Sequence, residues 1–96
     1  MLDALGRTPD EIADSLRARG IKGVRNTARF LNPIVRYVYS VTTDVYGIDL
    51  IQADRLRIVF ANKQVTEVPV PEAVLAFLDL FHRGQYPDLE MPVGPG

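Results

Sequence analysis

The residues of this sequence with the clearest capacity for binding are cationic, and they are concentrated in one segment. No Asp or Glu occurs from Ser15 to Thr43, although Arg and Lys recur throughout that stretch. Guanidinium and ammonium groups bind carboxylates and phosphates. We therefore take as the candidate contact set for a protein or nucleic-acid partner Arg17, Arg19, Lys22, Arg25, Asn26 and Arg29.

The C-terminal third of the chain has the opposite charge. Apart from Arg83, its formally charged residues are Glu67, Glu72, Asp79, Asp88 and Glu90. Charge asymmetry of this kind is typical of proteins with an anionic partner. It is equally expected of two regions of one chain that attract each other, and it permits self-association by head-to-tail or two-fold pairing. The sequence leaves these interpretations open.

The residue types that catalysis usually requires are scarce. The chain contains no Cys and a single His, His82, which excludes thiol chemistry, zinc–thiolate sites, His-based triads and two-His metal sites. Asp44, Asp49 and Asp54 are expected at outward strand or turn positions, where carboxylates are normally solvated. No calcium loop or phosphate-binding glycine loop is present. We therefore expect no enzyme activity, no cofactor, no metal site and no small-molecule substrate.

An alternative function is helix-turn-helix or winged-helix DNA binding. In this hypothesis Val24 to Leu31 forms a second helix that enters the major groove and presents to the bases Arg25, Asn26 and Arg29. The phosphates would be contacted by Arg17, Lys22 and Arg36. The segment is equally compatible with a loop, and as a helix it provides only about two turns. Met1 to Arg7 is also too short for the helix that normally precedes such a pair, so this remains the second hypothesis.

Local signals define the helix that positions the first basic side chains. Thr8 is suited to cap a helix, Pro at the next position favours a first turn, and Glu11 completes a capping box. Gly20 predicts a left-handed end, with the next apolar residue folding back onto the helix. These signals predict a helix from Pro9 to Arg19.

A second helix is predicted over residues 33–41. Asn32 is a capping residue and Pro33 suits the first helical position. The β-branched content of this stretch favours a strand instead. We give more weight to the cap and predict a helix.

From Val45 the apolar period changes to two, which predicts antiparallel strands. The inward residues of the first two strands are expected to be Tyr46, Ile48 and Leu50, then Leu56, Ile58 and Phe60. A third strand is expected over Val65 to Val68. Together they form a three-stranded meander with one face to bury.

A long apolar helix from Pro71 to Arg83 is the expected cover for that meander. Its helically spaced apolar residues are Val74, Phe77, Leu78 and Phe81. The expected fold class is therefore α+β: a three-stranded antiparallel meander packed against a C-terminal helix, with one or two N-terminal helices. We expect a single domain over residues 1–90 and a flexible tail over residues 91–96. No apolar run is long enough to span a membrane and no signal pattern is present, so a cytoplasmic location is expected.

Three stretches of the sequence together resemble an uncharacterised family of small proteins from high-GC Gram-positive bacteria and their phages. They are TPDEIADSLRARGIKG, NPIVRYV and VPVPEAVLAFLDLFHRGQYPDL. The family pattern includes G-I-x-G, then P-[IV]-x-x-Y, then P-x-x-V-x-x-F-x-x-x-F-x-x-G-x-Y-P-x-L. The chain departs from it at Asn32, Val35 and His82, where the family commonly has Cys, Ala and Asp. The resemblance supports the expected fold and implies a phage-encoded protein that acts on a host protein. Our leading hypothesis comes from the residues themselves. The missing catalytic set and cofactor motif, and the basic middle with an acidic end, favour a small non-enzymatic protein-interaction module that uses the basic surface.

Overall fold

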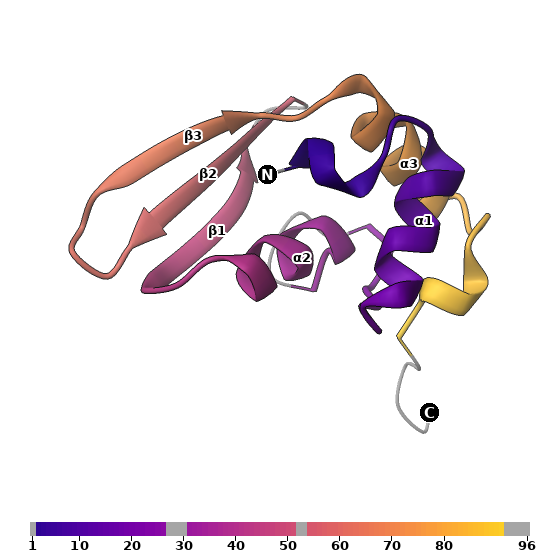
Figure 1. The fold of residues 1–96 in the computed structure, drawn as a ribbon, viewed down its shortest axis with the longest axis horizontal. Coiled ribbons are helices and arrows are strands. Elements are labelled where there is room, and N and C mark those ends of the chain that lie inside the picture. Colours follow the sequence, from indigo (N-terminus) through magenta and orange to yellow (C-terminus); the bar gives the residue numbers. More distant parts are fainter. Residues whose placement is uncertain (1, 27–30, 52–53, 92–96) are drawn as a thin grey trace.

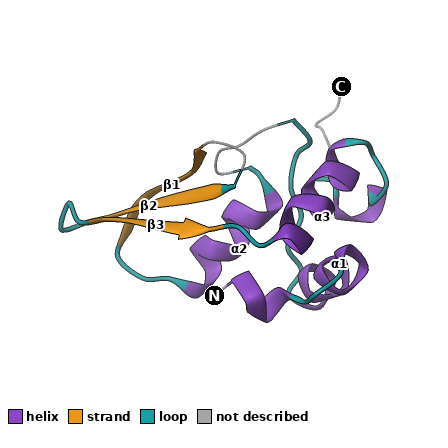
Figure 2. Ribbon diagram, turned by 90° about the horizontal axis from the view of Figure 1, so that it is seen from above, coloured by secondary structure: helices purple, strands orange, loops and turns teal. Residues whose placement is uncertain are grey.

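The computed structural model describes residues 2–26, 31–51 and 54–91 and confirms the α+β class. Figure 1 shows the sheet at one end of the molecule, α1 and α3 together at the other, and α2 between them. Figure 2 shows the same arrangement from above. The elements in chain order are a 3₁₀ helix η1 (Leu2–Leu5), α1 (Pro9–Ala18), α2 (Pro33–Val41), β1 (Val45–Ile51), β2 (Arg55–Phe60), β3 (Val65–Pro69), α3 (Glu72–His82) and a 3₁₀ helix η2 (Pro87–Leu89).

Helix α1 begins and ends where its local signals predict. The Thr8 hydroxyl accepts a hydrogen bond from the Glu11 N–H at 3.2 Å, which satisfies a backbone donor of the first turn. At the other end Gly20 has φ +68°, and the Ile21 N–H donates to the Leu16 carbonyl at 3.0 Å. This is the expected Schellman termination.

Helix α2 confirms the prediction from its cap and excludes the strand alternative. The side-chain oxygen of Asn32 accepts hydrogen bonds from the Ile34 and Val35 N–H groups at 2.9 and 3.3 Å. Asn32 is fully buried, so these bonds satisfy donors that water cannot reach. The cap thus outweighs the strand preference of the β-branched residues.

The sheet is the predicted antiparallel meander, with strand order β1-β2-β3. Ile48, Leu56 and Ile58 are buried as expected, whereas Leu50 and Phe60 are partly exposed. The prediction that Tyr46 points inward is wrong, because Tyr46 is 82% exposed. A register irregularity between Val45 and Gly47 interrupts the alternation of β1, as a β-bulge does.

Helix α3 provides the largest aromatic part of the core, as predicted. The Phe77 ring is fully buried and stacks on Phe81 and Tyr86, with ring centroids 5.9 and 5.2 Å apart. The helix shares one hydrophobic cluster with the sheet, but its most extensive packing is against α1. Helix α2 is the one that lies most closely against β1. One hydrophobic cluster links the three helices with the inward face of the sheet.

The segment after α1 is tied to the end of the described chain. Gly23 forms a parallel bridge with Glu90: its N–H donates to the Leu89 carbonyl and its own carbonyl accepts from the Met91 N–H, both at 2.9 Å. A Cβ at Gly23 would lie 2.5 Å from a side-chain atom of Pro33, so only Gly fits. Met91 is therefore held by the domain, although it falls in the predicted tail. Residues 92–96 lie outside the described part.

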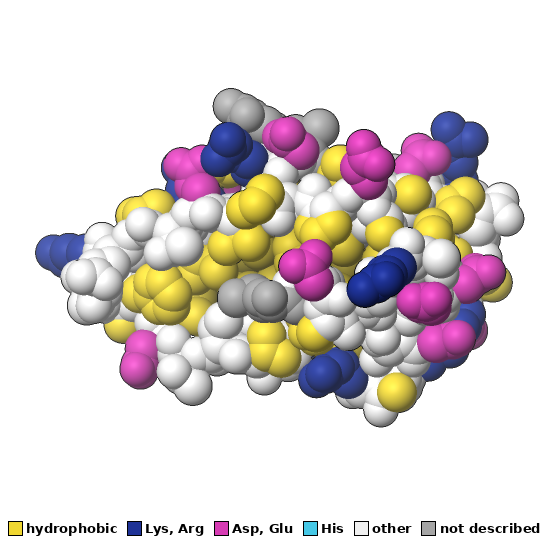
Figure 3. Space-filling view, turned by 45° about the horizontal axis from the view of Figure 1, so that its top comes forward, with side chains coloured by type: hydrophobic (Ala, Val, Ile, Leu, Met, Phe, Trp, Pro, Cys, Tyr) yellow, Lys and Arg dark blue, Asp and Glu magenta, His cyan; other side chains and the backbone are white. Residues whose placement is uncertain are grey.

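Apolar side chains also reach the surface. Figure 3 shows a band of them across one face, with most charged side chains at its margins. In the described part of the chain, the exposed large hydrophobic residues are Val41, Tyr46 and Val65. Among the described residues, no helix is long and apolar enough to cross a membrane.

Candidate interaction surface

The structure distributes the basic candidate residues over the end of α1 and the turn that follows it. Arg17 lies in the last turn of α1, and Arg19 is its C-cap. Lys22 follows the left-handed Gly20 and is exposed. Arg25 and Asn26 form an exposed turn after the Gly23 bridge. Arg29, the remaining candidate, lies outside the described residues.

Arg17 is paired with acids of its own chain. Its guanidinium contacts the Asp14 carboxylate at 2.7 Å and the Asp88 carboxylate at 2.5 Å, and it lies 6.0 Å from the centroid of the Tyr86 ring. The hydrogen bond from Arg17 holds the pKa of Asp88 below its usual range. In this contact, therefore, the basic segment and the acidic C-terminal third attract each other.

Arg25 and Asn26 are also engaged with the C-terminal part of the chain. The Arg25 guanidinium pairs with the Glu90 carboxylate at 3.0 Å. The Asn26 N–H donates to Nδ1 of His82 at 2.8 Å, so His82 accepts with a neutral ring nitrogen. Burial lowers the pKa of His82 and outweighs the opposing effect of Asp79.

The expected alternative of a helix over Val24 to Leu31 does not hold for its described residues. Asn26 has φ +62°, outside the helical range, and the Val24 N–H donates to the Leu31 carbonyl at 2.8 Å. That bond joins the two ends of the segment. The loop interpretation is therefore correct for residues 24–26. The first residues of the recognition helix that the DNA-binding hypothesis requires are not helical.

Three cations near this segment have no carboxylate within 4.0 Å in the described structure: Arg19, Lys22 and Arg36. Arg19 lies instead with its guanidinium 5.1 Å from the centroid of the Tyr37 ring, a cation–π distance. Arg36 has its Nε buried without a hydrogen-bond partner. An unsatisfied buried donor costs about 1–3 kcal/mol, so this atom stands out in the described structure.

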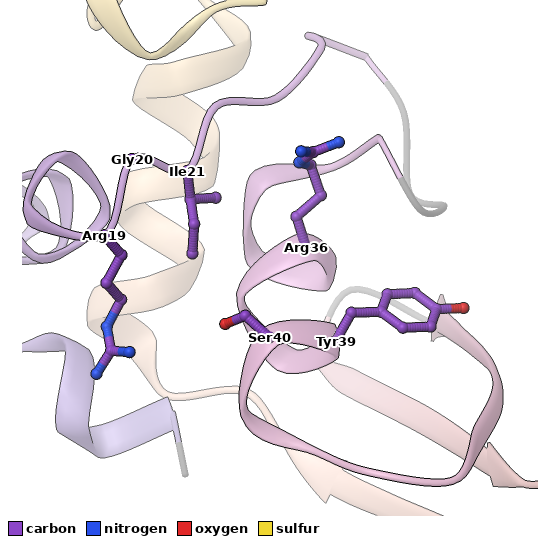
Figure 4. Close-up of a pocket in the computed structure, with 6 residues that line it drawn as sticks. All are labelled: Arg19, Gly20, Ile21, Arg36, Tyr39 and Ser40. Atoms are coloured by element: carbon purple, nitrogen blue, oxygen red, sulfur yellow. The ribbon is translucent and has the colours of Figure 1, made fainter.

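A pocket of about 490 Å³ lies between the end of α1 and α2. It is lined by Arg19, Gly20, Ile21, Arg36, Tyr39 and Ser40. No acidic residue contributes to its wall. Figure 4 shows Arg19 and Arg36 coming from opposite sides with their guanidinium groups directed away from each other, and Ile21 and Ser40 between them. The two charges therefore suit anionic groups that are separated in space.

The hydroxyl groups of the two α2 residues Tyr39 and Ser40, which line the pocket, already form hydrogen bonds within the protein. The Tyr39 hydroxyl accepts a hydrogen bond from the Ile48 N–H at 3.1 Å, and the Ser40 hydroxyl donates to the Tyr37 carbonyl at 2.6 Å. The Tyr39 bond joins α2 to β1, whereas the Ser40 bond lies within α2. The Ser40 proton is directed at a backbone carbonyl, whereas a nucleophilic serine needs a base that accepts its proton.

The candidate set from the sequence omits Arg36, although this residue completes the pocket. The signal was present, since Arg36 lies in the same acid-free stretch as the chosen residues. What the sequence does not disclose is that α2 brings Arg36 beside Arg19.

The described residues contain no group of three or more His, Asp or Glu residues placed to hold a metal ion.

Comparison with family models, curated proteins and solved structures finds no match to this chain. The family resemblance of the sequence therefore remains a prediction.

Proposed function

We propose that this protein is a small non-enzymatic interaction module that binds an acidic segment of a partner protein. The contact residues are Arg19 and Arg36, which line the pocket between α1 and α2, together with Lys22, which follows the lining residue Ile21 in the chain. The observation that carries the proposal is the acid-free pocket with two arginines that have no carboxylate partner of their own in the described structure. A carboxylate from another chain would supply the missing partner.

The arrangement of the pocket favours an extended acidic peptide over a single phosphate. The guanidinium groups of Arg19 and Arg36 point in different directions, so one compact anion does not reach both (Figure 4). An extended segment with two carboxylates can reach both, and the apolar side chain of Ile21 lies between them. The apolar band on the surface also favours association with another protein (Figure 3).

Arg17 and Arg25 have a different role in this proposal from the one expected. Each is paired with an acid from the C-terminal third, so a partner would have to replace Asp88 or Glu90. They hold the basic turn in place and make weaker contact residues. A phage origin and a host target, which the family resemblance implies, remain predictions.

The test is a fluorescence-anisotropy titration with a labelled peptide of alternating Glu and Ala, compared with its Gln analogue. We expect saturable binding of the Glu peptide only. Arg19→Gln and Arg36→Gln should each weaken it by at least about tenfold, because a charge-assisted hydrogen bond contributes about 1.5–3 kcal/mol. The matched control is Lys63→Gln, which removes the same charge from the turn between β2 and β3 and should change affinity less than twofold.

Two results would contradict the proposal. One is equal binding of the Gln peptide, which would show that charge is not recognised. The other is unchanged affinity in both arginine variants, which would place the contact elsewhere. A titration with duplex DNA at low and at physiological salt tests the alternative function, DNA binding. Tight binding that weakens steeply with salt would favour a nucleic-acid partner.

A further inference from the structure

A second pocket lies beyond the C-terminal end of α2 and has the opposite character. Its volume is about 410 Å³, and it is lined by Thr43, Asp44, Phe60, Ala61, Asn62 and Gln64. Asp44 is the only charged residue among them. The Phe60 ring is partly exposed and contributes an aromatic surface. This pocket shares no residue with the one between α1 and α2.

Backbone hydrogen bonds fix the walls of this pocket. The Asp44 carbonyl accepts from the Ala61 N–H at 2.7 Å, which ties the connection after α2 to the β2–β3 turn. Within that turn the Gln64 carbonyl accepts from the Phe60 N–H at 2.8 Å, and the Asn62 side chain accepts from the Gln64 N–H at 3.0 Å. The pocket is therefore preformed, as small ligand sites usually are.

The backbone of Asp44 is held in an uncommon conformation. Its φ is +57°, in the left-handed region that non-glycine residues seldom adopt. Such residues persist where the surrounding structure holds them, and they cluster at binding sites. Here the bond to Ala61 holds the conformation, and Asp44 forms part of the pocket wall.

The end of α2 adds negative potential at the same place. The last turn of a helix carries partial negative charge, which a basic side chain often balances. The last turn of α2 contains no basic residue. Instead, the Thr42 hydroxyl donates to the Val38 carbonyl at 2.7 Å, a neutral partner that leaves the dipole uncompensated. Asp44 lies two residues after Thr42, the C-cap of α2.

We propose that this pocket binds a guanidinium or alkylammonium cation, as presented by an arginine or lysine side chain. The Asp44 carboxylate pairs with the cation and the Phe60 ring contacts its face, the two interactions that favour such groups. A planar guanidinium fits this pair best, because it stacks on a ring while it donates to a carboxylate. The site is independent of the proposed function and would remain if the acidic-peptide pocket failed its test.

The test is an NMR titration of the ¹⁵N-labelled protein with N-acetyl-arginine amide, its lysine equivalent and its citrulline equivalent. Citrulline has nearly the shape of arginine but no charge. We expect saturable shifts at the pocket residues with arginine, weaker shifts with lysine and none with citrulline. The two source classes, a partner's side chain and a free amine, are separated by comparing an arginine-containing peptide with free agmatine.

Two variants and one control make the outcome decisive. Asp44→Asn tolerates the left-handed backbone and should weaken arginine binding about tenfold or more. Phe60→Leu keeps an apolar side chain without a ring face and should also weaken it, with thermal unfolding confirming that the domain is intact. Asp49→Asn removes a carboxylate from a strand outside the pocket and should change nothing. Equal shifts with citrulline, unchanged binding in Asp44→Asn, or no saturable shift with arginine would each overturn the proposal.

Discussion

Truncation of Phe77 tests the central place of α3 in the core. The side chain is fully buried, and its ring stacks on Phe81 in the next turn of α3 and on Tyr86 after the helix. The same helix makes its most extensive contacts with α1. Phe77→Ala would remove the ring at the point where these groups meet and leave a cavity between them.

The expected loss is large relative to the stability of such a domain. Phe→Ala truncations in a core cost about 3–5 kcal/mol, from lost burial and from the residual cavity. Ninety-six residues correspond to a free energy of unfolding of roughly 5–14 kcal/mol. A domain of this size loses roughly 4–8 °C in thermal midpoint per kcal/mol. We therefore expect the midpoint to fall by at least about 12 °C.

Urea and thermal unfolding followed by circular dichroism would measure this loss. The matched control is Tyr46→Ala, which also removes an aromatic ring but at an 82% exposed position. That substitution should change stability by no more than about 0.5 kcal/mol. A Phe77→Ala loss below about 1.5 kcal/mol, or a Tyr46→Ala loss of similar size, would refute the assignment of the core.

Two further predictions concern a cap and a titrating group. Asn32→Ala should cost about 0.5–2 kcal/mol in urea unfolding, because the Ile34 and Val35 N–H groups lose their acceptor. Asn32→Ser, which keeps a neutral capping acceptor and buries no charge, is the control, and equal stability of the Ala variant would contradict the role of the cap. For His82, burial lowers the pKa below its ordinary value of 6.5, so the folded protein binds fewer protons than the unfolded chain. Stability should be full above about pH 6.5 and fall as the pH drops through the lower folded-state pKa, and His82→Gln should flatten this dependence; an identical slope in the variant would refute it.

The parts of the fold that local chemistry specifies were predictable from the sequence. Thr8, Gly20 and Asn32 act on backbone groups within a few residues, so their effects on α1 and α2 follow from neighbouring positions alone. The meander followed from the period-two apolar pattern. Tyr46 was mispredicted because a bulge in β1 changes which side of the sheet a residue points to. The apolar alternation of the sequence does not reveal the bulge.

The candidate site was less predictable, because it depends on contacts between distant parts of the chain. The sequence showed the basic segment and the acidic C-terminal third, but not which charges would meet. In the structure Arg17 and Arg25 are paired with Asp88 and Glu90, and Arg36 joins Arg19 at the pocket. Tertiary packing determines which charged residues meet, and the periodicity and spacing of the sequence do not predict these pairs directly.

The bridge between Gly23 and Glu90 has a consequence for how the chain folds. It closes a loop that contains most of the sequence, so it carries a large entropic cost and forms only after the intervening segments have collapsed. On the ribosome, Asp88 and Glu90 are also synthesised well after Arg17 and Arg25. A nascent chain therefore presents Arg17 and Arg25 before Asp88 and Glu90 are available to pair with them, so we expect its affinity for polyanions to be higher than that of the native fold.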